Sequence, residues 1–108
     1  MAVKMRVFYP FGDTKRFIGS SASAIVKKTQ EGHPDFSAAK SIDGYLGFML
    51  RNLNGAGFNI VIRVGQSTEE RCEEFLQKFV AANLGFLVEK DSPKDKELHE
   101  NLRTYKCN

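Results

Sequence analysis

The sequence predicts an α+β open-faced sandwich, in which three helices pack on one face of a small antiparallel sheet. Three observations predict this fold. The apolar residues of 42–53 recur at helical spacing, those of 58–64 alternate as in a strand, and a capping box at 67–70 opens a further amphipathic run. With 108 residues, of which 42% are hydrophobic, the chain suits one domain built around one core.

The first predicted strand begins at Lys4, where polar and apolar residues alternate. Pro10 has no backbone N–H to donate to a neighbouring strand, so we expect the strand to end there. Residues 13–19 are predicted to form a loop that carries two adjacent basic side chains, Lys15 and Arg16.

Two helices are predicted next, and serines mark where each begins. Ser20 and Ser21 precede residues 22–30, and either serine can cap that helix by accepting a hydrogen bond from a free backbone N–H. Ser41 or Ser37 is the predicted cap of the second helix. A continuous apolar stripe predicts that this helix faces the core, and the stripe consists of Ile42, Tyr45, Leu46, Met49, Leu50 and Leu53.

The second half of the chain predicts two more strands and a third helix. Residues 58–64 are rich in β-branched side chains and predict a strand. The capping box Ser67–Glu70 opens the third helix, which turns Cys72 towards the core, and residues 86–89 predict a short final strand. The apolar face predicted for the 58–64 strand consists of Phe58, Ile60, Ile62 and Val64.

The composition turns polar near the C-terminus. Residues 1–88 are therefore predicted to form the α/β domain, and residues 89–108 a polar C-terminal tail or a short amphipathic helix. Pro93 suits the first position of such a helix. Its apolar face would consist of Leu98, Leu102 and Tyr105.

Charge and composition restrict the location and the partners. The net charge is +3, with nine basic against four acidic side chains before Val64. This basic first half could attract an anionic partner, although solvated lysines explain the same count more simply. No apolar run reaches the roughly 18 residues that span a bilayer, and no signal-peptide pattern is present, so we expect a cytoplasmic protein without a membrane partner. The two cysteines, Cys72 and Cys107, form no disulfide framework and suit a reducing compartment.

The order of these motifs over about residues 4–84 resembles the histidine-containing phosphocarrier protein (HPr) family of the sugar phosphotransferase system. That family has a Lys-Ser-Ile/Leu-x-Gly turn at the start of its second helix, then a glycine, a strand, and a Gly-x-Asp/Glu-Glu entry to its last helix. The residues that take those places here are Lys40, Ser41, Ile42, Gly44, Gly57, Ile60, Ile62, Gly65, Glu69 and Glu70. The resemblance implies an HPr-like sandwich, with a regulatory phosphorylation position at Ser41 and a partner surface around it.

The resemblance fails at the residue that carries the family's chemistry. HPr proteins hold a phosphoryl group on a histidine at the N-terminus of the first helix, whereas this chain has Arg16-Phe-Ile-Gly-Ser-Ser-Ala22 there. Serine forms a much more inert phosphate ester than the imidazole nitrogen does, so we expect no phosphocarrier activity and no enzyme.

The sequence predicts neither a metal nor a cofactor. The acidic residues 69–74 have no histidine at ligand spacing, and a solvated helix face explains them. No glycine-rich phosphate-binding signature occurs.

The sequence therefore predicts a non-enzymatic regulatory or binding protein that docks a protein partner, or a phosphate or other anion, at the N-termini of its first two helices. Free N–H groups and the helix dipole favour negative charge there. The predicted binding residues are Arg16, Ser20, Ser21, Lys40 and Ser41.

The alternative is a small nucleic-acid-binding α/β domain. In that reading, bases would stack on Phe8 and Phe58 beside the charge of Arg63. The oligomeric state stays open.

Overall fold

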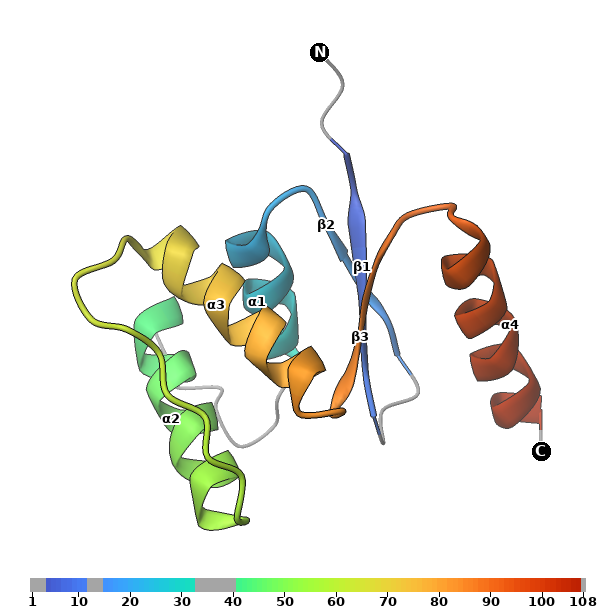
Figure 1. Cartoon of the computed structure of the whole chain (residues 1–108). Coiled ribbons are helices and arrows are strands. Elements are labelled where there is room, and N and C mark those ends of the chain that lie inside the picture. The colour runs from blue at the N-terminus through green and yellow to red at the C-terminus, as the bar shows by residue number, and fades with distance from the viewer. Residues whose placement is uncertain (1–3, 12–14, 33–40, 108) are drawn as a thin grey trace.

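The computed structural model of the chain describes residues 4–11, 15–32 and 41–107, with side chains as far as residue 102. It is a small α+β fold, in which these residues form four helices and a three-stranded antiparallel sheet (Figure 1). The elements are β1 (Arg6–Pro10), β2 (Phe17–Gly19), α1 (Ala22–Glu31), α2 (Ile42–Gly55), α3 (Thr68–Ala81), β3 (Gly85–Glu89) and α4 (Pro93–Cys107).

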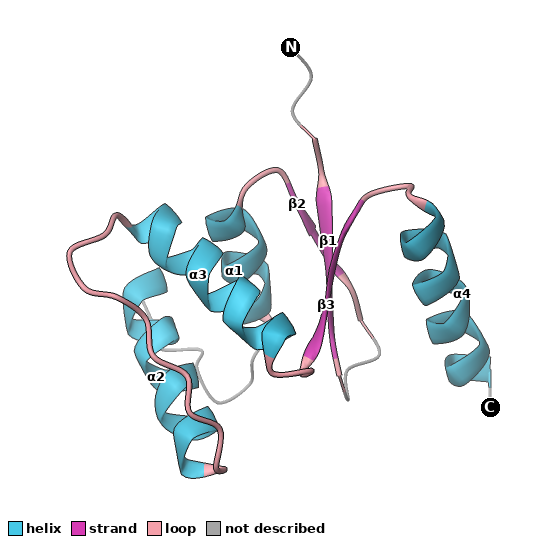
Figure 2. Cartoon of the chain, in the orientation of Figure 1, coloured by secondary structure: helices cyan, strands magenta, loops and turns pink. Residues whose placement is uncertain are grey.

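The sheet has the order β2-β1-β3, so β1 is its central strand (Figure 2). Phe8 of β1 lies opposite Phe17 of β2 and Leu87 of β3. Since side chains alternate along a strand, this register places the three residues on one face and Tyr9 on the other. The predicted loop over 13–19 is corrected here, because residues 17–19 form β2. Three residues are too few for alternation to indicate a strand in the sequence.

Both faces of the sheet are covered, which corrects the open face that the sequence predicted. Helices α1 and α3 pack on the face that carries Phe8, α2 lies beyond them, and α4 lies on the opposite side (Figure 1). Of the two forms predicted for residues 89–108, a polar tail or a short amphipathic helix, the structure has a helix, which begins at Pro93. Asp95 of this helix is only 2% exposed, because its side chain accepts a hydrogen bond from the Tyr9 hydroxyl on this face of the sheet.

The predicted strand over 58–64 is wrong. Within the described residues this segment joins no sheet and runs over α2 and α3 instead (Figure 2). Ile60 is buried and its backbone N–H donates to the Asn54 side chain at 2.9 Å, whereas Val64 is 94% exposed. Since β2 and β3 already pair with both edges of β1, the central strand has no place for this segment.

The helix starts follow the sequence closely. The side chain of Ser21 caps α1, that of Ser41 caps α2, and both hydrogen bonds of the Ser67–Glu70 capping box are formed at α3. Cys72 is fully buried as predicted, and burial raises the pKa of its thiol to about 12. No helix in the described part of the chain is long and apolar enough to cross a bilayer.

Candidate functional site

Among the predicted binding residues that the structure describes, the serines at the helix starts and Arg16 have different surroundings. The side-chain oxygens of Ser21 and Ser41 each accept a helix-capping hydrogen bond, from Ala24 N–H at 3.1 Å and from Gly44 N–H at 3.0 Å. Ser20 is exposed just before α1. Lys40 lies outside the described residues.

Arg16 lies apart from these serines, beside α4. Its guanidinium contacts Asp95 Oδ1 at 3.0 Å and the Tyr9 hydroxyl at 3.3 Å. The positive charge that the sequence offered to an external anion is therefore paired within the molecule.

The N-terminus of α1 already holds a carboxylate from the chain itself. Glu69, in the first turn of α3, accepts from Ala22 N–H at 2.8 Å and from Ser23 N–H at 3.0 Å. Burial opposes ionisation of Glu69, but the hydrogen bonds from Ser23 and Ala22 outweigh it and lower the pKa of this carboxyl. The sequence places Glu69 at the start of its own helix, where it suits the dipole, and gives no sign that it reaches a second helix.

Replacing Glu69 by glutamine is expected to lower the free energy of unfolding by about 0.5 to 1 kcal/mol at neutral pH, because the charge at the α1 dipole is lost. Urea denaturation of Glu69→Gln and of the parent measures the difference. Glu97→Gln, on the exposed face of α4, is the matched control and should change little. Equal stability of Glu69→Gln and the control would show that this contact adds nothing.

A concave site lies between the sheet and the helices α1, α2 and α3. This aromatic pocket has a volume of about 520 Å³. Its apolar lining comprises Phe8, Phe17, Tyr45, Met49, Phe75 and Phe79. Phe8, Tyr45 and Phe75 belong to the hydrophobic core, so the pocket reaches into the centre of the fold.

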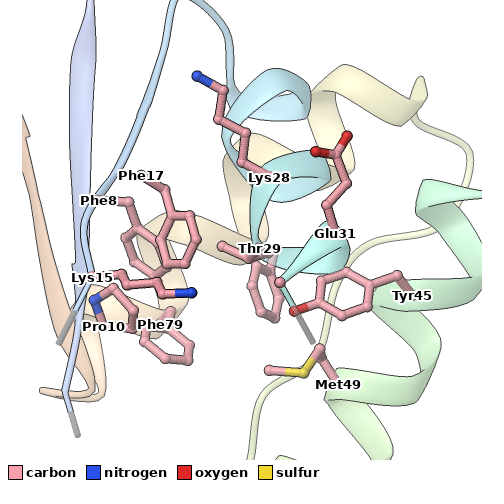
Figure 3. A pocket seen from close by; sticks show the side chains of 12 residues that line it. Phe8, Pro10, Lys15, Phe17, Lys28, Thr29, Glu31, Tyr45, Met49 and Phe79 are labelled. Atoms are coloured by element: carbon pink, nitrogen blue, oxygen red, sulfur yellow. The ribbon is translucent and has the colours of Figure 1, made fainter. Parts of the chain in front are cut away.

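Three charged side chains also line the aromatic pocket. Lys15 extends its ammonium group into the space between the phenylalanine rings and Tyr45 (Figure 3). Lys28 and Glu31, both on α1, point away from that space at its opening (Figure 3). The Lys28 ammonium donates to the Ile18 carbonyl, which directs it along β2.

Two hydroxyl groups also line the aromatic pocket, those of Thr29 on α1 and Tyr45 on α2. Thr29 donates to the Val26 carbonyl at 2.7 Å, and its oxygen is hydrogen-bonded to the Tyr45 hydroxyl. Burial raises the pKa of Tyr45, so its phenol stays neutral at physiological pH. The arrangement can enclose an apolar body.

The described residues contain no group of three histidine, cysteine, aspartate or glutamate side chains placed to hold a metal ion. Comparison of the chain with protein-family models, curated proteins and solved structures finds no match.

Sequence reasoning predicts part of this site. Tyr45 and Met49 belong to the stripe that it turns inward. Sequence reasoning does not predict the aromatic pocket itself. A cavity forms where packed elements leave space between them, and the periodicity of a single segment carries no information about that space.

Proposed function

We propose that this protein is a non-enzymatic binding protein whose ligand is a small molecule held in the aromatic pocket. The observation that carries the proposal is a cavity of about 520 Å³ that is lined by five aromatic rings and reaches the core. Its volume falls in the range of known ligand sites, which are concave, mostly apolar and bear few polar groups.

The aromatic walls also set the strength of binding. Enclosing a ring of about 150 Å² gives a gross gain of about 4 kcal/mol, from which the cost of association is subtracted. A ligand that fills more of the cavity gains more. We therefore expect micromolar or weaker affinity for simple aromatic compounds.

Binding of the neutral fluorescent probe N-phenyl-1-naphthylamine is expected to be saturable and to shift backbone amides near Thr29 and Tyr45 in two-dimensional NMR spectra. Met49→Trp fills the pocket from α2 and should weaken binding at least about tenfold. The control Asn52→Trp places the same ring on the exposed side of α2. Equal affinity of the two folded variants, or shifts that avoid the pocket, would refute the assignment.

Docking of a protein partner around Ser20, Ser21 and Ser41 stays a prediction, as does the HPr-like relationship that suggested it. An external anion at the N-terminus of α1 is disfavoured, because the backbone N–H groups of Ala22 and Ser23 already donate to the Glu69 carboxylate. At α2 the Ser41 hydroxyl is exposed. A regulatory role would appear as phosphorylation there.

The nucleic-acid alternative has less support. The Phe8 ring is 3% exposed, and α1 and α3 cover its face of the sheet, so it offers no stacking platform. Arg63 is exposed but pairs with Glu74 at 3.2 Å. Oligonucleotide binding that falls steeply with salt would favour this alternative over the small-molecule proposal.

A further inference from the structure

The outer edge of β3 is open to further hydrogen bonding. Just beyond the end of this strand, the Lys90 N–H donates to the Met5 carbonyl at 2.9 Å. Hydrogen-bonded and non-hydrogen-bonded pairs alternate along an antiparallel ladder, so Val88 and Phe86 bond to β1 while the backbone groups of Leu87 point away from it. Within the described residues, neither the N–H nor the C=O of Leu87 has a hydrogen-bond partner. Leu87 therefore presents an unused donor and an unused acceptor to another strand.

The opposite edge of the sheet, at β2, is better protected. β2 has only three residues, and the Lys28 ammonium donates to the carbonyl of one of them, Ile18. Sheet edges avoid pairing with other chains by being short or by carrying lysine or proline. β3 has five residues, Gly-Phe-Leu-Val-Glu, and includes neither. Figure 1 shows α3 and α4 to either side of β3, and neither helix pairs with its edge.

We propose that this protein forms a two-fold homodimer in which the β3 edges of two copies pair antiparallel and join the two sheets into one. This inference goes beyond the proposed function and does not depend on it. The two-fold axis would pass beside Leu87, so that Leu87 of one copy lies opposite Leu87 of the other. These two residues would then exchange both backbone hydrogen bonds. Every contact on one side of the axis is repeated on the other.

The side chains of β3 are complementary to themselves in this register, which is the argument for a second copy as the partner. Phe86 of each copy lies opposite Val88 of the other in a non-hydrogen-bonded pair, on the face of the sheet that carries Tyr9. Aromatic and β-branched side chains are favourable partners at such positions. Glu89 lies opposite Gly85, so like charges do not face each other.

The apolar surface at this edge also favours association. Phe86, Leu87 and Val88 are each partly exposed in the single copy. Phe11 is 57% exposed, and its ring lies 5.4 Å from that of Phe86, so it extends the apolar surface on the same face. Pairing removes part of this surface from water. Because an edge-to-edge contact is small, we expect a weak dimer with a Kd of about 100 µM.

Sedimentation equilibrium of the full chain from about 10 µM to about 1 mM, under reducing conditions, is expected to show a monomer–dimer equilibrium. Glu89→Pro removes an outward N–H without removing a hydrogen bond to β1, and it should raise the Kd at least about tenfold. The matched control, Glu89→Ala, loses the same exposed side chain and its ion pair with Lys4 but keeps the N–H. This control should dimerise as the parent does.

Amide hydrogen exchange reads the proposed contact directly in the parent protein. The Leu87 N–H should exchange about fourfold more slowly at 1 mM than at 10 µM, because the dimer protects it. This measurement decides the question if circular dichroism shows that Glu89→Pro does not fold.

Three results would overturn the proposal. A parent that stays monomeric up to about 1 mM would exclude the dimer and leave the edge to an extended peptide of another protein. A dimer that persists unchanged in folded Glu89→Pro would place the contact elsewhere, as would a Leu87 exchange rate that does not depend on concentration. Assemblies larger than a dimer would contradict the closed two-fold contact.

Discussion

Replacing Asp95 by alanine is expected to lower the free energy of unfolding by about 3 to 5 kcal/mol, because it leaves part of a buried charged network without its partner. The Asp95 carboxylate accepts from the Tyr9 hydroxyl at 2.5 Å, from Arg16 at 3.0 Å and from Asp91 N–H at 2.8 Å. These bonds attach α4 to the sheet. Urea denaturation measures the loss, and faster amide hydrogen exchange over 93–102 would locate it.

Tyr9→Phe is the matched control for Asp95→Ala. It removes one donor but keeps the ion pair with Arg16, so its cost should be about 1 to 2 kcal/mol. Equal stability of the parent and Asp95→Ala would mean that the network does not hold α4.

The Asp95 carboxylate also makes the free energy of unfolding depend on pH in the acidic range. Burial raises the pKa of Asp95, but the bonds from Tyr9 and Asp91 and the charge of Arg16 outweigh burial, so the folded pKa lies below its ordinary value. The stability that Asp95 contributes is fully present above the unfolded pKa of about 3.9 and is lost as the pH falls through the lower, folded value. Asp95→Asn should lose this part of the acid dependence.

Gly85→Ala is the second substitution with a large expected effect, about 3 kcal/mol of destabilisation. A Cβ atom at Gly85 would lie 2.5 Å from the Tyr9 carbonyl oxygen and 3.0 Å from Pro10 Cα. Both neighbours are backbone atoms of β1 and cannot rotate away. The start of β3 would therefore separate from β1, the strand with which it pairs.

Thermal denaturation of Gly85→Ala should show a melting temperature lower by at least about 10 °C. The control is Gly55→Ala at the end of α2, where an added Cβ meets nothing within 4 Å and alanine favours the helix. An unchanged melting temperature for Gly85→Ala would show that the strands have room to shift.

Helix starts were predictable because their signals are local. A helix cap joins a serine side chain to the backbone N–H three residues later, and Ser21, Ser41 and Ser67 all act in this way. Residues 86–89 also lie in a strand as predicted.

The 58–64 segment shows where local pattern misleads. Its β-branched residues favour a strand, but among the described residues the segment pairs with no strand of the sheet. Ile60 is buried outside the sheet instead. The sequence of the segment does not show whether its apolar residues will pack in a sheet or against helices.

By itself, the sequence determined that this chain makes a small α+β fold, where three of its helices begin to within a few residues, and that Cys72 lies in the core. Only the tertiary structure decided that α4 covers the second face of the sheet, that Glu69 fills the N-terminus of α1, and that Lys15 and Arg16 separate onto opposite faces. Caps and periodicity act over a few residues. Pairing of distant charges and the gap left between packed elements depend on how those elements meet in space.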